Sequence, residues 1–215
     1  MADGEVKINL GCGPATLPGF DNIDNSPSVF LARHPLLKKL LYKLRVISKQ
    51  HYETPWPRDI IWRDASRRLP YADDAVDKLY SSHFLEHLKR DKAVAVLEEC
   101  RRVLKPGGIF RLVVPDLHYH ARRYVEETDA LLAADSAERE TLDRFMYTVS
   151  GGYTHRRRSA HYYMYDWPTF KLLLTKLGFV NVEQKGYQQS ADPELAALDN
   201  RPDESLHVEM TVPER

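Results

Sequence analysis

The stretch "KINLGCGPATLPGFDNID", residues 7–24, decides the fold class of this 215-residue chain. It runs from a short apolar strand into a glycine turn and then into a second short apolar run, which is how nucleotide-binding α/β domains begin. Asp24 follows Gly13 by only eleven positions, although a crossover between parallel strands normally needs at least about ten to twelve residues including its helix. The sequence therefore predicts a sharp turn with little room for a first helix.

The rest of the chain alternates strand and helix patterns, which predicts an α/β fold: a mainly parallel twisted sheet with helices on both faces. We expect one Rossmann-like domain, residues 1–215, because two domains would be cramped at this length. The expected strands are 6–10, 20–24, 60–64, 75–82, 109–115, 179–187 and 205–212, and the expected helices are 84–88, 93–104, 117–127, 137–150 and 167–177.

Two insertions fall outside this alternation, at residues 29–58 and 128–166. The first contains an amphipathic basic helix over 35–49, which we expect to cover the sheet face that the missing first helix leaves open. An anionic membrane surface is the alternative partner. The apolar stripe of this helix consists of Leu36, Leu37, Leu40, Leu41 and Leu44.

The second insertion contains "THRRRSAHYYMYDW", residues 154–167, which mixes cations with aromatic side chains. Such a loop can hold an anionic or sugar group over a cleft, or it can be a solvated charged face. We interpret Arg156, Arg157 and Arg158 as a solvated face at least as readily as an anion site. The lid candidates are His161, Tyr162 and Tyr165.

The composition argues against several classes of function without excluding them. Thirty-one basic residues balance thirty-one acidic ones, so no overall field attracts nucleic acid, and no nucleic-acid partner is expected. The two cysteines, Cys12 and Cys100, are too few for a disulfide framework. Neither a signal-peptide pattern nor a long apolar run is present, so we expect a cytoplasmic protein without a membrane span.

The glycine turn favours a ligand other than a dinucleotide. Gly11 and Gly13 let the backbone approach a ligand, but Thr16 stands where a dinucleotide fingerprint has its third glycine. Asp24 and Asp64 end neighbouring strands at the same edge of the sheet, where a carboxylate can accept ribose hydroxyls. For Asp24 the alternative is a turn former in "DNSP".

These residues belong to segments that resemble a known family. "INLGCG", "GFDNID", "DASRRLPYADDAVDKLYSSHFLEHL", "EECRRVLKPGGIFRLVVPD" and "MYDWPTFKLLLTKLGF" are similar to the motifs of class I S-adenosylmethionine-dependent methyltransferases. The closer similarity is to the bacterial type 11 set, whose members often end in a pattern like "LDNRPDESLHVE". The resemblance covers nearly the whole chain and implies a methyltransferase domain that uses S-adenosyl-L-methionine.

The resemblance also implies roles for individual residues around that cofactor. Asn9 departs from the family, because many relatives have an acidic residue there. The implied cofactor contacts are Gly11 and Gly13, with Leu10 and Cys12 of the same turn, to the methionine part; Asp24 to the ribose; Asp64 and Ala65 to the adenine; and Ser81, Ser82 and His83 beside the methionine amino group and the methyl.

Methyl transfer from a sulfonium is an in-line displacement, so positioning can supply much of the catalysis. A hydroxyl acceptor also needs a base, and histidine suits that task near neutrality. The candidate bases are His83, His87, His155 and His161, with His83 first because it follows the strand end that faces the methyl.

Several neighbouring residues can be given a structural role instead of a catalytic one. Asp116 either orients the acceptor or caps the next helix, with capping favoured, and Glu86 is interpreted as the capping partner in "SSHFLEH". His87 is expected in the core. Although His83 and His87 could chelate a metal, no third ligand is evident in the sequence, and we predict no metal site.

The sequence thus predicts a methyltransferase for a small-molecule or saccharide-like acceptor, with oxygen as the expected acceptor atom. An alternative is a cofactor-binding module without turnover that acts as a partner or regulator. A nicotinamide oxidoreductase is disfavoured by Thr16.

Overall fold

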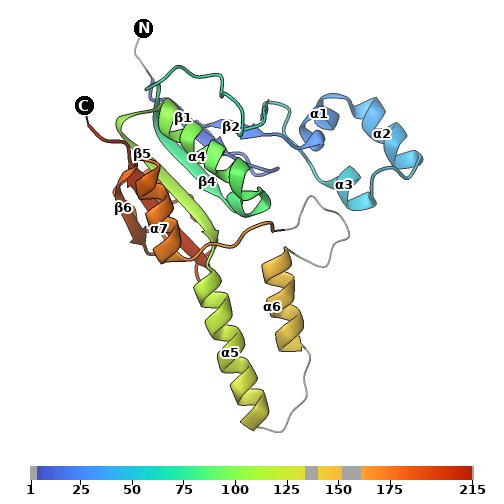
Figure 1. Cartoon of the computed structure of the whole chain (residues 1–215). Coiled ribbons are helices and arrows are strands. Elements are labelled where there is room, and N and C mark those ends of the chain that lie inside the picture. Colours follow the sequence, from blue (N-terminus) through green and yellow to red (C-terminus); the bar gives the residue numbers. More distant parts are fainter. Residues whose placement is uncertain (1–3, 134–139, 152–160, 215) are drawn as a thin grey trace.

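We describe a computed structural model of the chain, covering residues 4–133, 140–151 and 161–214. The candidate base His155 and the arginines Arg156, Arg157 and Arg158 lie outside the described residues. Figure 1 shows a twisted sheet with helices α4 and α7 in front of it, while the α5–α6 pair and the α1–α3 group extend away from the sheet.

The described part of the chain forms one sheet of seven strands in the order β3-β2-β1-β4-β5-β7-β6. Strand β7 is antiparallel to both neighbours, and the other described pairs are parallel. The strand order reverses between β1 and β4, which is where open α/β sheets bind ligands. The predicted α/β, mainly parallel sheet is confirmed. The strands are β1 Lys7–Leu10, β2 Asp21–Asp24, β3 Ile61–Trp62, β4 Val76–Ser82, β5 Leu104–Pro115, β6 Val180–Lys185 and β7 Ser205–Thr211.

Two amphipathic helices, α4 (Arg90–Val103) and α7 (Trp167–Lys176), bury their apolar stripes against one face of the sheet in the main core. Helices α5 (Leu117–Ala133) and α6 (Glu140–Ser150) pack on each other as a hairpin. None of the helices in the described residues is long and apolar enough to cross a membrane. The remaining helices are α1 Pro27–Arg33, α2 Pro35–Lys43, α3 Lys49–Glu53, the 3-10 turn η1 Leu85–His87, and α8 Pro193–Ala196.

The connection from β1 to β2 contains no helix in residues 11–20, all of which are described. A pair of buried asparagines holds this turn instead. Asn22 Oδ1 accepts hydrogen bonds from Asn9 Nδ2 at 2.9 Å and from Leu17 N at 2.8 Å. The Asn22 amide nitrogen donates to the carbonyls of Leu17 at 3.0 Å and Phe20 at 2.9 Å. Asn9, the departure from the family pattern, therefore stabilises the short crossover.

The face of the sheet opposite α4 and α7 is covered by residues 186–204, which we call the strap. Successive residues of a strand point to opposite faces, so Tyr80 and Val113 face away from the main core. They form a second apolar cluster with Phe20, and Leu195 and Leu198 of the strap pack onto it.

We expected insertion 29–58 to cover the open face of the sheet, but it does not lie on the sheet. That expectation was wrong. Helix α2 contacts only its neighbours α1 and α3 closely, and Figure 1 places all three beyond the β2 side of the sheet. Leu36 is 84% exposed, Leu40 51% and Leu44 63%. The physical reason is that the strap already occupies the face that the stripe would have covered.

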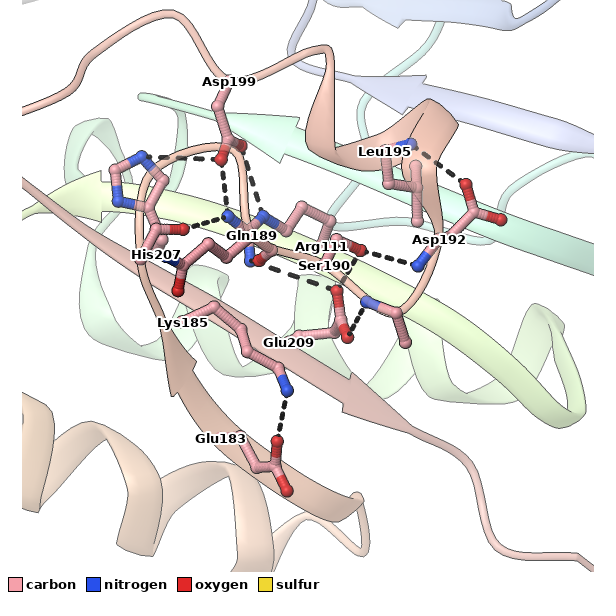
Figure 2. Close-up of polar contacts among 12 residues, drawn as sticks. Arg111, Glu183, Lys185, Gln189, Ser190, Asp192, Leu195, Asp199, His207 and Glu209 are labelled. Atoms are coloured by element: carbon pink, nitrogen blue, oxygen red, sulfur yellow. Dashed lines mark hydrogen bonds and ion pairs between the residues drawn. The ribbon is translucent and has the colours of Figure 1, made fainter.

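A buried arginine ties the strap to the sheet (Figure 2). Arg111 of β5 is fully buried, and its guanidinium donates to both carboxylate oxygens of Asp199, Nε at 3.2 Å and Nη2 at 2.5 Å. It also donates to the carbonyls of Gln189 at 2.9 Å and Gly186 at 3.1 Å. Bidentate pairing of this kind fixes geometry as well as charge. Glu209 of β7 adds a second anchor, since it accepts hydrogen bonds from Ser190 Oγ and from Ala191 N.

Replacing Arg111 by Met should release the strap, because the buried Asp199 carboxylate would lose its bidentate ion pair and keep only the hydrogen bond from Gln188 N at 2.9 Å and the nearby His207 ring. Breaking a buried ion pair from one side typically costs about 3–5 kcal/mol of unfolding free energy. Urea unfolding of wild type and Arg111→Met measures this cost. Arg201→Met is the matched control, since Arg201 pairs with Glu204 on the exposed surface and such pairs contribute about 0–1 kcal/mol. Equal losses in the two variants would contradict the anchoring role.

Candidate active site

A cleft of about 590 Å³ opens at the carboxyl ends of β1, β2 and β4. Its wall combines the glycine turn after β1, the start of α1 after β2, and the turn after β4. Each of the two insertions adds an aromatic side chain. The lining residues are Gly11, Gly13, Asp24, Asn25, Ser26, Pro27, Trp56, His83, Phe84, His87, Leu88 and Tyr162.

The glycine turn requires glycine for two different reasons. Gly11 has φ +70°, and a Cβ there would lie 2.3 Å from the Phe84 ring, so a side chain has no room. Gly13 has φ +56° and open space around it, which leaves its backbone accessible from the cleft. Between them, burial raises the pKa of the Cys12 thiol to about 12, with a further contribution from Asp24, so Cys12 is a neutral thiol and not a nucleophile.

Asp24 closes the turn from the end of β2. Its Oδ2 accepts a hydrogen bond from Gly13 N at 2.9 Å, and its Oδ1 accepts one from Ser26 N at 2.7 Å. A carboxylate oxygen can accept more than one hydrogen bond, so both oxygens retain capacity toward the cleft. Asp24 is thus the turn former that "DNSP" indicates and also part of the cleft wall.

Gly11→Ala should destabilise the protein more than Gly19→Ala. Both glycines have positive φ, but around Gly19 the nearest contact for a Cβ is Lys7 Nζ at 3.7 Å. Overpacking against Phe84 should add about 1–3 kcal/mol to the loss of unfolding free energy at Gly11, measured by urea unfolding. In the double variant Gly11→Ala/Phe84→Ala, the extra loss of unfolding free energy caused by Gly11→Ala should disappear. Equal losses in Gly11→Ala and Gly19→Ala would show that Phe84 does not define the turn.

His83 begins the turn after β4 in a strained conformation with φ +50°, a region that non-glycine residues seldom occupy and that clusters at functional sites. Its backbone N–H donates to Val113 O at 2.9 Å. The ring lies between two partners, with Nε2 3.0 Å from Ser205 Oγ and Nδ1 3.3 Å from Glu86 Oε1. The imidazole is therefore held at both nitrogens, by the end of the strap and by a buried carboxylate.

Glu86 does not cap the turn as predicted. Phe84, the N-cap of η1, makes no side-chain cap hydrogen bond, and the Glu86 side chain is 0% exposed. Among the described residues neither carboxylate oxygen of Glu86 has a hydrogen-bond partner. The capping interpretation was wrong because Glu86 turns inward, toward the histidines.

The last part of the second insertion returns to this point. His161 packs its ring on His87, with centroids 5.0 Å apart, and burial lowers the pKa of His161, which favours the neutral ring. Tyr162 N donates to Glu86 O at 2.7 Å. The fold thus gathers His83, His87 and His161 around Glu86. His87 lines the cleft with its side chain 32% exposed, so its assignment to the core was wrong.

Some of the predicted cofactor contacts line the cleft, and others do not. Gly11, Gly13, Asp24 and His83 line one cleft, whereas Leu10 is buried in the main core. The Ser81 hydroxyl is buried and donates to Leu10 O at 3.0 Å, which joins β4 to β1. The Ser82 hydroxyl turns to the strap, 3.5 Å from Asn200 Oδ1.

Other candidates lie outside the described cleft lining. Asp64 accepts hydrogen bonds from Ser66 N at 2.9 Å and Ser66 Oγ at 2.7 Å, and Ala65 is buried. Their contact with an adenine stays a prediction. Asp116 caps α5 by accepting from His118 N at 2.9 Å, which confirms the capping interpretation. Tyr165 was wrongly assigned to the lid, because it is buried in the core.

Trp56 is a wall residue that the sequence reasoning missed. It stands between two prolines in "TPWPRD", and an aromatic residue in so polar a segment was the available signal. Ser205 was missed as well, although it follows the "LDNRPDE" segment directly. The approach of both residues to the cleft depends on how the insertion and the strap fold back.

Comparisons with known proteins agree with this geometry. A family model described as "Methyltransferase domain" matches residues 42–112, from the end of α2 into β5. No curated protein matches the chain.

Solved structures share the fold at low sequence identity. A SAM-dependent methyltransferase from Methanosarcina mazei is 17% identical, with a TM-score of 0.52, 100% of this chain and 95% of that chain being covered. A possible histamine N-methyltransferase from Thermotoga maritima is 14% identical with a TM-score of 0.50, covering 96% and 81%. The Haemonchus contortus phosphoethanolamine N-methyltransferase 2, bound to phosphomonomethylethanolamine and S-adenosylhomocysteine, is 13% identical with a TM-score of 0.52, covering 100% and 50%.

At these identities the solved structures establish the fold, which this chain shares with S-adenosylmethionine-dependent methyltransferases. The methyltransferase-domain model matches residues 42–112, so this segment is similar to that family in sequence as well.

Proposed function

We propose that the protein transfers a methyl group from S-adenosylmethionine to a hydroxyl of a small-molecule or saccharide-like acceptor. The observation that carries this proposal is that His83, held at both ring nitrogens, lines the same cleft as the glycine turn and Asp24. The glycine turn proposed to hold the cofactor and the histidine proposed to act as the base therefore line the same cleft.

The cleft fits the cofactor in size and chemistry. Its volume of about 590 Å³ lies within the roughly 300–1,000 Å³ typical of small-molecule sites. Asp24 offers carboxylate oxygens to ribose hydroxyls, and the open backbone at Gly13 allows the methionine part to approach. When bound, the cofactor supplies an electrophilic methyl group on its sulfonium.

Asp24→Asn should weaken binding of S-adenosylmethionine and of its demethylated product by about 1–3 kcal/mol, the cost of leaving buried polar partners unpaired. Calorimetric titration measures the effect. Asp21→Asn is the matched control at the other end of β2, where Asp21 accepts from the exposed Tyr71 hydroxyl, and it should bind like wild type. If wild type bound neither compound, the enzymatic proposal would have to be dropped.

His83 is suited to act as the base because Glu86 can accept a hydrogen bond from Nδ1–H, which would leave the Nε2 lone pair for an incoming hydroxyl. An acceptor that takes the place of the Ser205 hydroxyl at Nε2 would give its proton to that nitrogen while its oxygen bonds to the methyl group. The bond between the methyl group and the sulfonium sulfur would break, and the neutral thioether would leave. The carboxylate of Glu86 then stabilises the imidazolium, as an acidic partner does for other catalytic histidines.

The aromatic residues in the cleft wall suit an acceptor that is compact and rich in hydroxyl groups. Trp56 and Tyr162 come from the two insertions, and Phe84 lies beside them in the lining. Aromatic side chains bury apolar area while Trp and Tyr also offer a polar handle. This combination suits sugars and phenols, whose rings have an apolar face and a polar edge.

His83→Ala should lower kcat by about 10²–10⁴-fold, the usual contribution of a general base, while affinity for the demethylated cofactor stays near the wild-type value. The assay is release of that product with a panel of sugars, phenols and hydroxy acids. His118→Ala, at an exposed position on α5, is the control. Unchanged turnover in His83→Ala would exclude the base assignment, and cofactor binding without turnover on any acceptor would favour a non-catalytic module.

A further inference from the structure

Three side chains beside the cleft have ligand atoms that converge. Glu86 and His87 belong to η1 after β4, and His161 lies near the end of the second insertion. Their ligand atoms all lie within 4.8 Å of one another. We propose that Glu86, His87 and His161 bind a divalent transition-metal ion.

The three side chains would have to move slightly closer together to bind a metal ion. Bonds of about 2.0–2.2 Å in a tetrahedral site place ligand atoms roughly 3.4 Å apart. The ligand atoms now lie within 4.8 Å of one another, so the side chains need to converge by up to about 1.4 Å. The main chain already holds the two segments together. Tyr162 N and Tyr163 N donate to Glu86 O at 2.7 and 3.3 Å, and His161 N donates to Ser150 O at 3.1 Å.

A second observation points independently to a cation. Glu86 is 0% exposed, and in the described residues neither carboxylate oxygen has a hydrogen-bond partner. Its Oε1 lies 3.3 Å from His83 Nδ1 and 3.9 Å from His87 Nε2, and these rings carry a charge only when they are protonated. The buried His161 Nδ1 has no described partner either. Burying a carboxylate without hydrogen bonds is costly, and natural proteins compensate such groups by pairing or by metal coordination. One ion between these groups would satisfy all of them.

His83 completes the arrangement as a positioning residue. Its Nδ1 lies 3.3 Å from Glu86 Oε1, so it can orient the carboxylate while the carboxylate ligates the ion. Groups that hold a metal ligand in place in this way commonly tune affinity. The role of His83 as a base in methyl transfer is compatible with this contact, because Nε2 faces Ser205.

The ligand set selects the type of metal. Two imidazoles and one carboxylate suit borderline ions such as Zn²⁺, Co²⁺ and Ni²⁺ better than Mg²⁺ or Ca²⁺, which prefer oxygen ligands. Three protein ligands leave a fourth position free, and His87 lines the cleft. An acceptor hydroxyl bound there would have a lowered pKa, a consequence that rests on the proposed methyl transfer.

The test is metal uptake by the tag-free protein after dialysis against a chelator. Co²⁺ is added while its visible absorption is recorded, and Zn²⁺ is titrated by calorimetry. One ion of each should bind per chain. Glu86→Gln, His87→Ala and His161→Ala should each weaken binding by more than the roughly 10–100-fold typical of residues that only orient a ligand, the range expected for His83→Ala. The control His118→Ala should bind like wild type.

Binding of S-adenosylhomocysteine and the melting temperature are measured on the same samples. These measurements distinguish failure of the proposed metal site from failure of the proposed function and from loss of the fold. Protein that is folded and binds the demethylated cofactor but takes up neither ion would overturn the metal site and leave the proposed function intact. Metal binding that survives both Glu86→Gln and His161→Ala would overturn it too. Because Glu86→Gln removes a buried charge without a hydrogen bond, this variant should melt no lower than wild type in the absence of metal.

Discussion

The buried pair of Arg111 and Asp199 is the constraint on which the rest of the structure depends. The turn after β1 is too short for a helix, so one face of the sheet would be open. The strap closes that face, and its main polar anchor is Arg111, which lies in the middle of an apolar strand and binds the Asp199 carboxylate and two strap carbonyls. Desolvating these charges is expensive, and their mutual hydrogen bonds offset that cost. The same anchor sets the path of the strap into β7, where Ser205 meets His83.

The active site therefore uses parts from distant regions of the sequence. The glycine turn and Asp24 come from the first 24 residues, His83 and Glu86 follow β4, and Ser205 begins β7. Each is fixed locally: Asp24 by the backbone N–H groups of Gly13 and Ser26, and His83 by its contacts at both ring nitrogens. The two insertions add Trp56 and Tyr162 to the rim. The turn proposed to hold the cofactor thus shares one cleft with aromatic side chains from both insertions.

The sequence predicted the features that depend on local pattern. Strands, the glycine turn and the carboxylate at the end of β2 follow from short-range rules, and so does the cap at Asp116. The cover of the open face was mispredicted because a leucine stripe shows that a helix has an apolar side but not where that side packs. Glu86 was misread for a related reason, since serines ahead of a glutamate suggest a capping box. Ser82 and Glu86 are four positions apart, whereas a capping box has them three apart, so the spacing was the signal against capping. Arg111 was the missed signal, because an arginine within "IFRLVVP" has to find a buried partner.

A crystal structure of the protein with S-adenosylhomocysteine would show whether one cleft joins the cofactor turn to the base. We expect the ribose hydroxyls at Asp24, the homocysteine chain along Gly11 and Gly13, and the sulfur directed toward His83. Density for the ligand at any other surface, or in this cleft with its sulfur turned away from His83, would rule out this arrangement.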